Sequence, residues 1–308
     1  MKVLISGASG LIGTALIAQL EREGHRVVRL VRPLSRSHPG GAPSTSRNDS
    51  EATWDPDSGS IDASRLQNTD AVVNLAGASI ARWPWTSAHK RRVLESRVRS
   101  TSLLARTVAA LPRKPRVFVS ASGVGYYGDR GDEVLRETSA GGRGFLAEVC
   151  RAWESAAAPA SDAGIRLATL RVGMVLSNTG GALPVMARPF RLGLGGVLGN
   201  GRQYMSWIAI EDLVRAIAHA IDHEDLSGPV NAVSPAPVTN AEFTVALGRV
   251  LHRPTPFPVP AFALRALLGE MADELLLSSQ RVEPARLQAS GFSYRHPNLE
   301  EALRAVLA

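Results

Sequence analysis

Residues 2–32 read KVLISGASGLIGTALIAQLEREGHRVVRLVR, and this stretch decides the fold. Residues 3–5 are apolar and run into a glycine-rich turn, a pattern typical of a buried strand. Apolar residues then recur at helical spacing over residues 11–23 and stop at Gly24, a residue type that commonly ends helices. Residues 26–31 are rich in valine and predict a second strand. Strand, glycine turn, helix and strand within about 30 residues make one βαβ unit, whose crossover is right-handed.

The turn inside this unit has the glycine spacing of a dinucleotide-binding loop. Gly7 permits the tight turn, Gly10 lets a pyrophosphate approach the backbone, and Gly13 allows helix and strand to pack closely. The start of the helix offers free N–H groups and a positive dipole end to the phosphates. The expected phosphate-binding residues are Gly7, Ser9, Gly10, Leu11, Ile12 and Gly13.

The end of the second strand indicates which dinucleotide is bound. Sites that prefer NAD place Asp or Glu there to hold the ribose hydroxyls, whereas this chain has Arg32. A guanidinium cannot accept hydrogen bonds from hydroxyls, but it can grip a 2′-phosphate. Arg29 and Arg36 are nearby alternatives for the same contact with the 2′-phosphate. The sequence therefore predicts NADP(H) in preference to NAD(H), and the alternative is that Arg32 simply points to solvent.

The first half of the chain continues to alternate between strand-like and helix-like segments. We expect strands over residues 71–75, 116–120 and 165–171 and helices over residues 87–110 and 145–160. This alternation predicts an α/β fold, a Rossmann-type doubly wound parallel sheet. Residues 33–50 are rich in serine, proline, glycine and arginine without periodicity, and they predict a flexible surface loop.

The alternation of strand-like and helix-like segments ends in the second half of the chain. Residues 189–207 are glycine-rich and residues 254–260 carry four prolines, and neither pattern continues a parallel sheet. We therefore assign residues 1–172 to a Rossmann domain that binds NADP(H), and residues 173–308 mainly to a smaller C-terminal substrate-cap domain. Some segments of the second half are expected to return to the Rossmann sheet.

The bulk composition excludes several classes of protein. The formal net charge is +7, but the basic residues are scattered and form no patch of a recognised nucleic-acid-binding module. No apolar stretch reaches the ~18 residues that could span a membrane. We therefore expect no nucleic acid and no membrane as partners. The expected partner is a small-molecule substrate, and a homodimer is left open.

The cysteine and histidine residues indicate a reducing compartment and no metal. Cys150 is the single cysteine, so no intrachain disulfide can form, and the cytoplasm is the default location. Cys150 falls within an expected helix and is interpreted as a small core residue. His219 and His223 share a helical spacing, but no cysteine is nearby and no glutamate lies between them as in zincins. We therefore expect no metal site.

Further motifs follow the glycine turn along the chain. They are NLAG at 74–77, VSAS at 119–122, YYG at 126–128, FLAEVC at 145–150, WE at 153–154, a glycine-rich segment at 195–203, SWI at 206–208, GPVNA at 228–232, PAPVTN at 235–240 and GEM at 269–271. In this order they resemble the extended short-chain dehydrogenase/reductases. More narrowly, they resemble the atypical "epimerase family" branch, which is similar to NAD-dependent epimerases and dehydratases. The resemblance covers nearly the whole chain, and relative to it residues 33–50 look like an insertion.

The resemblance implies a Rossmann domain, NADP(H) binding and further site residues. Leu75, Ala76 and Gly77 end the expected strand, and the small residues among them would let the adenine-ribose side of the cofactor lie against the backbone, although an ordinary strand-to-loop turn would look the same. Ser120 and Gly173 are additional cofactor-binding candidates.

The chain departs from the family pattern at the catalytic pair. Typical members carry Tyr-x-x-x-Lys on the helix after the catalytic serine, where the tyrosine transfers a proton and the lysine lowers the pKa of that tyrosine. The matching positions here hold Phe145 and Val149, which can do neither. The catalytic candidates are therefore Ser122, which is best placed by resemblance, and then Tyr126 and Tyr127.

Other residues near these motifs are weaker candidates. Glu148 and Glu154 lie on the same expected helix, and each is more simply a surface or structural carboxylate. Lys90 could contact an anion or a substrate. Trp207 is interpreted as a core residue. Ala209 stands where the branch usually has a histidine, and the sequence leaves open whether a function or only a packing residue has been lost.

These observations leave three functions to weigh. The first is an NADP(H)-dependent oxidoreductase or epimerase of unknown small-molecule substrate, with a substitute acid or base. The alternative is a non-catalytic NADPH-binding protein that senses redox state or regulates a partner, which the replacements at Phe145 and Val149 favour. A partner-binding regulator without a cofactor comes third, and the intact glycine turn argues against it. The glycine-rich residues 193–201 and the cap favour the enzyme, because a sensor needs no second pocket.

Overall fold

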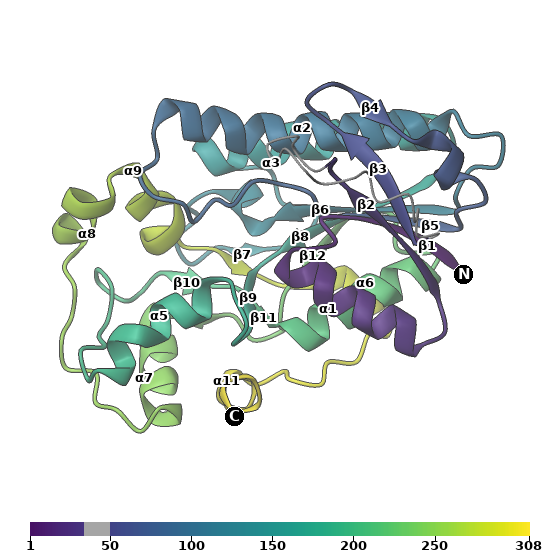
Figure 1. The fold of residues 1–308 in the computed structure, drawn as a ribbon. Coiled ribbons are helices and arrows are strands. Elements are labelled where there is room, and N and C mark those ends of the chain that lie inside the picture. The colour runs from purple at the N-terminus through teal and green to yellow at the C-terminus, as the bar shows by residue number, and fades with distance from the viewer. Residues whose placement is uncertain (34–49) are drawn as a thin grey trace, which may run out of the picture.

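A computed structural model describes residues 1–33 and 50–308, so most of the expected loop, including Arg36, lies outside the described residues. The strands of the main sheet are β1 (Lys2–Ser6), β2 (Arg26–Val31), β3 (Glu51–Asp55), β4 (Ser60–Ile61), β5 (Ala71–Asn74), β6 (Val117–Gly123), β8 (Arg166–Val172) and β12 (Gly228–Ala232). Their order is β12-β8-β6-β5-β1-β2-β3-β4 (Figure 1). Every neighbouring pair is parallel except β3 with β4. The predicted Rossmann-like α/β class is confirmed.

The strands bury both of their faces, because successive residues of a strand point to opposite sides of the sheet. Val3 and Ile5 of β1 belong to one apolar core, and Leu4 between them belongs to another. The same alternation separates Val73 from Val72 in β5. Strands buried on both sides read as continuous apolar runs, which explains the sequence of β1.

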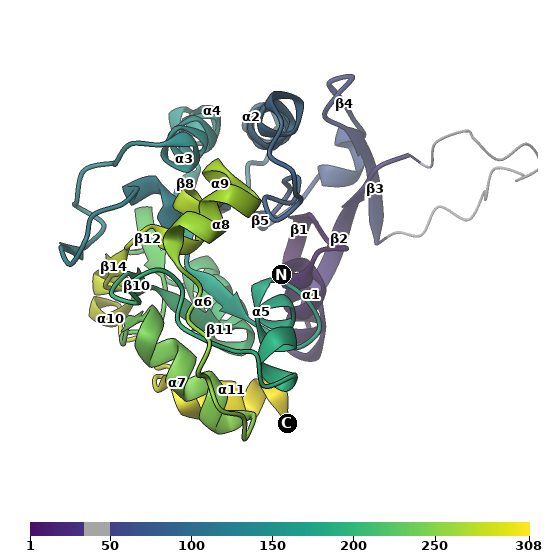
Figure 2. The same ribbon diagram turned by 90° about the vertical axis from the view of Figure 1, so that its left-hand side faces the viewer.

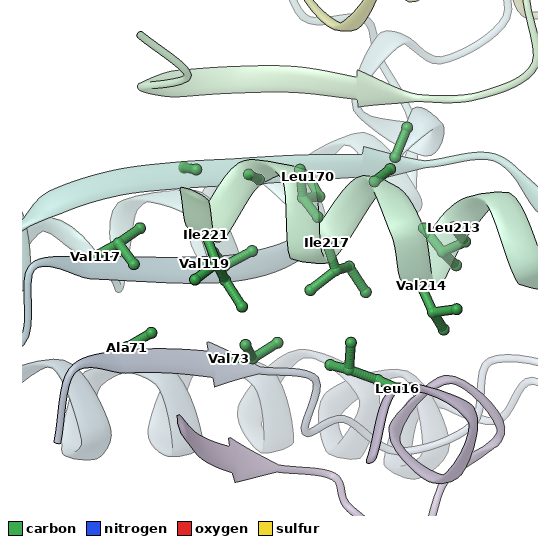
Figure 3. Packing of buried hydrophobic residues seen from close by; sticks show 14 of the residues in the cluster. Leu16, Ala71, Val73, Val117, Val119, Leu170, Leu213, Val214, Ile217 and Ile221 are labelled. Carbon is green, nitrogen blue, oxygen red and sulfur yellow. The ribbon is translucent and has the colours of Figure 1, made fainter. Parts of the chain in front are cut away.

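Helices cover the two faces of this sheet (Figure 2). One face carries α1 (Leu11–Arg22) and α6 (Ile210–Asp222), and the other carries α2 (Ser87–Ala109), α3 (Phe145–Ser155) and α4 (Ala158–Asp162). Apolar residues recur every three or four positions along α6, so one stripe of that helix meets the sheet. Figure 3 shows this packing, with the labelled residues Leu16, Ala71, Val73, Val117, Val119, Leu170, Leu213, Val214, Ile217 and Ile221.

The second half of the chain builds a separate core below the sheet in Figure 1. Its elements are β9 (Met174–Leu176), α5 (Ala182–Arg191), β10 (Tyr204–Met205), β11 (Trp207–Ala209), β13 (Val238–Thr239), α7 (Asn240–Val250) and α11 (Leu299–Leu307). The Trp207 side chain is fully buried in this core, and its indole N–H donates to the Ala236 carbonyl at 2.9 Å. Trp207 is thus a core residue. Two elements that follow residue 172, α6 and β12, lie in the layers of the main sheet.

The chain between α7 and α11 returns to the Rossmann part. Its elements are α8 (Ala261–Leu268), α9 (Glu270–Ala272), a π-helical turn (Asp273–Leu277), β14 (Arg281–Val282) and α10 (Ala285–Ala289). β14 pairs with β7 (Val134–Leu135), which follows the 3-10 turns η1 (Ala63–Leu66) and η2 (Val124–Tyr127) in the chain. Figures 1 and 2 both place α9 near the helices α2 and α3, whereas α8 lies farther from them in Figure 1.

Two negative observations apply to residues 1–33 and 50–308. No helix there is both long and apolar enough to cross a bilayer. No group of three or more His, Cys, Asp or Glu side chains there could hold a metal ion. His219 and His223 do share a helix face, and their rings stack at 3.5 Å.

Candidate functional site

The glycine turn between β1 and α1 has the tight shape expected for a phosphate-binding loop. Gly7 has a φ of 70°, a conformation that favours glycine. A Cβ atom on Gly13 would lie 2.2 Å from the Gly7 carbonyl oxygen, so only glycine lets α1 begin this close to β1. Gly10 is the N-cap of α1, no side chain caps this end, and the first turn holds no acidic residue. The positive end of α1 is therefore open to an anion.

A pocket of about 710 Å³ opens beside this turn. Its walls are the β1–α1 turn, the ends of β2 and β3, the residues after β5 and one face of α2. Five predicted cofactor residues line it: Gly7, Ser9, Arg32, Ala76 and Gly77. The sequence analysis missed the walls on β3 and α2, which include Trp54, Asp57, Ala88, Arg91, Arg92, Glu95, Ser96 and Ser100. The α2 residues recur at helical spacing, but only the fold shows which face of that helix meets the pocket.

The other predicted cofactor residues are outside the lining of this pocket. They are Gly10, Leu11, Ile12, Gly13, Leu75, Ser120 and Gly173. Ser120 is fully buried, and Asn74 Nδ2 donates to its Oγ at 3.4 Å. A Cβ on Gly173 would lie 2.6 Å from the Ser206 carbonyl oxygen. Both residues are thus tightly packed between protein segments, and their expected cofactor contacts stay predictions.

A buried polar network fixes the strand ends beside the pocket. Ser6 Oγ donates to Asn74 Oδ1 at 2.7 Å, and Asn74 Nδ2 donates to Thr101 Oγ1 at 2.8 Å. The indole N–H of Trp153 donates to the same threonine oxygen at 2.9 Å. β1, β5, α2 and α3 are therefore connected through groups whose hydrogen bonds would be costly to lose in the interior.

Arg97 supports the loop that follows β5. Its Nη1 donates to the carbonyls of Ala78 and Val93, at 2.9 and 3.0 Å, and the guanidinium lies 4.8 Å from the Trp153 ring centre. A Cβ on Gly77 would come within 3.1 Å of Arg97 Cζ. Burial lowers the pKa of Arg97 from its ordinary value. Gly77 is therefore needed where the loop passes over this arginine, a contact that the sequence alone did not indicate.

Ser122, the expected catalytic serine, belongs to a charged network behind the strand ends. Its Oγ donates to Glu154 Oε1 at 2.8 Å. The two oxygens of Glu154 also accept from Arg171 Nε and Nη2, each at 2.9 Å. Burial acts to lower the pKa of Arg171, but the hydrogen bonds and charge of Glu154 outweigh burial and raise that pKa above its ordinary value. Glu154 is therefore a structural partner that orients Ser122.

The two adjacent tyrosines have different surroundings. Tyr127 is fully buried, and its hydroxyl donates to Asn231 Oδ1 at 2.7 Å and accepts from Arg171 Nη1 at 3.1 Å. Burial raises the pKa of Tyr127. These contacts give the Tyr127 hydroxyl a structural role, and the expected catalytic role of Tyr127 stays a prediction. Tyr126 is half-buried, and the Arg171 guanidinium lies 3.4 Å from its ring centre.

Phe145, which replaces the family tyrosine, contacts a lysine. Lys90 Nζ lies 4.5 Å from the centre of the Phe145 ring, and Trp85 meets the same ring edge-on at 5.4 Å. Lys90 Nζ also lies 2.7 Å from both carboxylate oxygens of Glu270 in α9. Glu274, one turn further on, accepts from the Phe145 N–H at 2.9 Å. Two carboxylates of the C-terminal segment therefore contact α2 and the start of α3.

The sequence is similar to known families and proteins over nearly its whole length. Residues 3–233 match the NAD dependent epimerase/dehydratase family, and residues 259–306 match a domain of unknown function, DUF1731. This chain belongs to the NAD dependent epimerase/dehydratase family. An epimerase family protein of Mycobacterium leprae is 46% identical over 301 residues, covering 98% of this chain and 94% of the relative.

Two solved structures of epimerase proteins are similar to this chain in both sequence and fold. Human epimerase family protein SDR39U1, crystallised with NADPH, is 36% identical, with a TM-score of 0.87 and 99% of each chain covered. A nucleoside-diphosphate sugar epimerase from Corynebacterium glutamicum is 38% identical, with a TM-score of 0.78, and the match covers 100% of this chain and 58% of that one. The resemblance stated from the motifs is confirmed.

Three residues at or next to the positions where this chain departs from the family pattern are buried in the protein interior. Val149 is buried on α3, and Cys150 beside it is buried too, so that burial raises the pKa of its thiol. Ala209 is buried where β11 meets α6. Its carbonyl and side chain lie in the second-half core and not in the pocket. The interpretation of Cys150 as a core residue agrees with this burial, and any catalytic group must come from residues other than these three.

Proposed function

We propose that this chain binds NADP(H) and uses it for oxidation or reduction of a small molecule. The observation that carries the proposal is the uncapped start of α1 at the glycine turn, which opens beside a pocket containing Arg32. Human SDR39U1, a relative over its whole length, was crystallised with NADPH, which supports the same cofactor here. The single cysteine is buried, which suits the reducing conditions of the cytoplasm, the compartment that we propose.

The residues present fit a dinucleotide phosphate in chemistry and in shape. Gly7 and Gly13 keep the turn compact, so backbone N–H groups at the start of α1 can meet the pyrophosphate. Arg32 supplies the positive charge that a 2′-phosphate requires. The small residues Ala76 and Gly77 leave room along the pocket. When bound, a nicotinamide supplies or accepts a hydride, and the chain must provide the proton.

Lys90 is the proton donor that we propose for a carbonyl substrate. Its ammonium lies 4.5 Å from the centre of the ring of Phe145, the residue at the position where the family carries tyrosine. In reduction, the Nζ–H bond breaks as the proton moves to the substrate oxygen, and the amine left behind regains a proton from water. Glu270 would hold the Lys90 side chain in position, with its Oε1 2.7 Å from Nζ. Ser122 remains a candidate for orienting the substrate: with its hydroxyl proton donated to Glu154, its Oγ can accept a hydrogen bond from a substrate hydroxyl.

The second candidate is a non-catalytic NADPH-binding protein. Phe145 and Val149 favour it, because no phenol or amine stands at the family positions. In that case the Lys90–Glu270 pair only joins the C-terminal segment to α2. Both candidate functions require binding of NADPH, but only the first requires turnover of a substrate.

Two measurements test the proposal. Titration with NADPH and NADH, followed by nicotinamide fluorescence, should show binding with NADPH preferred. Incubation with NADPH and a panel of aldehydes, ketones and quinones should then show loss of nicotinamide absorbance that depends on the protein. Binding without turnover on any panel member would favour the sensor, and no binding of either dinucleotide would refute both candidates.

A further inference from the structure

Two arginines converge on one carboxylate. Arg32 and Asp57 line the pocket, whereas Arg99 is outside its lining and precedes the lining residue Ser100 on α2. Asp57, in the turn between β3 and β4, has Oδ2 3.2 Å from Nη1 of Arg32 and Oδ1 3.9 Å from Nη1 of Arg99. Arg32 follows β2, whereas Arg99 lies in the middle of α2. All three side chains are about half exposed, at 55%, 59% and 48% for Arg32, Asp57 and Arg99. An anion from solvent can therefore reach both guanidinium groups.

Fold stability does not account for this arrangement. Exposed ion pairs contribute little to the free energy of unfolding, because water screens the charges and both side chains lose freedom. Arg99 already has a local partner, since Glu95 one turn earlier on α2 lies 3.1 Å from its Nη2. This pair directs the Arg99 guanidinium along the helix face whose neighbours Glu95, Ser96 and Ser100 line the pocket.

We propose that Arg32 and Arg99 together form the 2′-phosphate subsite, and that Asp57 is an internal anion which the phosphate displaces. This inference rests on the proposed binding of NADP(H). A phosphate ester carries up to two negative charges and three acceptor oxygens, so it can satisfy two guanidinium groups that share a single carboxylate in the free protein. Asp57 therefore lowers the affinity for NADPH, and removing its charge strengthens binding.

The test compares four variants of the full chain with the wild type: R99A, D57N, R106A and E51Q. Arg106 is an exposed arginine on α2 outside the pocket lining, which makes R106A the matched control for R99A. E51Q removes a carboxylate from the pocket that has no ion pair with Arg32 or Arg99 among the described residues, so it controls for pocket charge. Dissociation constants are measured for NADPH and NADH, and for adenosine 2′,5′-bisphosphate against adenosine 5′-monophosphate.

R99A should weaken NADPH and the bisphosphate by about tenfold while changing NADH and the monophosphate by less than about twofold. D57N should lower the dissociation constants of NADPH and the bisphosphate by about threefold or more. R106A and E51Q should leave the ratio of the NADH to the NADPH dissociation constant unchanged. The inference is overturned if R99A weakens the binding of NADPH and NADH equally. It is also overturned if D57N and E51Q change the ratio of the two dissociation constants by the same factor. A wild type that binds neither dinucleotide overturns the proposed function instead, so the two failures are distinguishable.

Discussion

Replacing Glu154 by Gln should destabilise the protein strongly, because it leaves a buried arginine without its counter-ion. The Arg171 side chain is 4% exposed and that of Glu154 is 17% exposed, and two hydrogen bonds of 2.9 Å join them. Gln keeps the shape of the side chain and one acceptor oxygen, but it removes the negative charge. Breaking one side of a buried ion pair costs about 3–5 kcal/mol, so we expect a loss of at least about 3 kcal/mol.

Thermal and urea unfolding measure this loss directly. For a chain of this size about 2 °C of melting temperature corresponds to 1 kcal/mol, so E154Q should lower the melting temperature by about 6 °C or more. The matched control is D273N, which breaks the exposed pair of Asp273 with Arg265, whose side chains are 50% and 56% exposed. That control should cost less than about 1 kcal/mol.

A double variant separates the charge from the packing. R171M together with E154L replaces both partners by apolar side chains, and it should recover much of the stability that E154Q loses, because no charge is then left buried. Should E154Q cost no more than D273N, Arg171 must find water or another acceptor, and the interpretation of Glu154 as its structural partner would be wrong.

Four further outcomes are expected. R32A should weaken NADPH by about tenfold and NADH by less than about twofold in a fluorescence titration, because only NADPH has the 2′-phosphate; equal losses contradict that role. G13A should lower the melting temperature and abolish NADPH binding, since its Cβ would lie 2.2 Å from the Gly7 carbonyl oxygen; an unchanged dissociation constant would count against a compact phosphate loop. K90M should reduce turnover of any panel substrate at least about a hundredfold with the NADPH dissociation constant unchanged, and full turnover would remove Lys90 as the proton donor. Burial raises the pKa of Cys150, so its reaction with a disulfide reagent should be slow in the native protein and fast in guanidinium chloride; fast native labelling would show that the thiol is accessible.

Local sequence was enough to predict the sheet and its phosphate loop. The apolar run of β1 and the spacing of Gly7, Gly10 and Gly13 fix a strand, a turn and a helix by backbone geometry alone, and the structure has all three. Burial on both faces of a parallel strand also follows from an uninterrupted apolar run. These features depend on neighbours within one βαβ unit.

The site could be predicted only in part, because its remaining walls come from distant segments. Asp57 reaches the pocket through the β3–β4 turn, and Arg99 approaches Asp57 from the middle of a long helix. Neither contact leaves a local sequence pattern. Tyr126 and Tyr127 are adjacent in sequence, and only the path of the η2 turn decides that Tyr127 is the buried one.

The surroundings of Phe145, which stands at the position of the family tyrosine, bear on whether the protein is an enzyme. Phe145 is held by Trp85 at its edge and by Lys90 over its face, and the carboxylate of Glu274 accepts the first N–H of its helix. A sensor would need only an inert residue at this position. The structure instead brings an ammonium group to the phenylalanine from another helix, and it pairs that ammonium with Glu270 of the C-terminal segment. Because a charged amine beside an aromatic face gains little stability when it is partly exposed, packing alone is a weak reason for this arrangement, and the proton transfer that we propose for Lys90 supplies a second one.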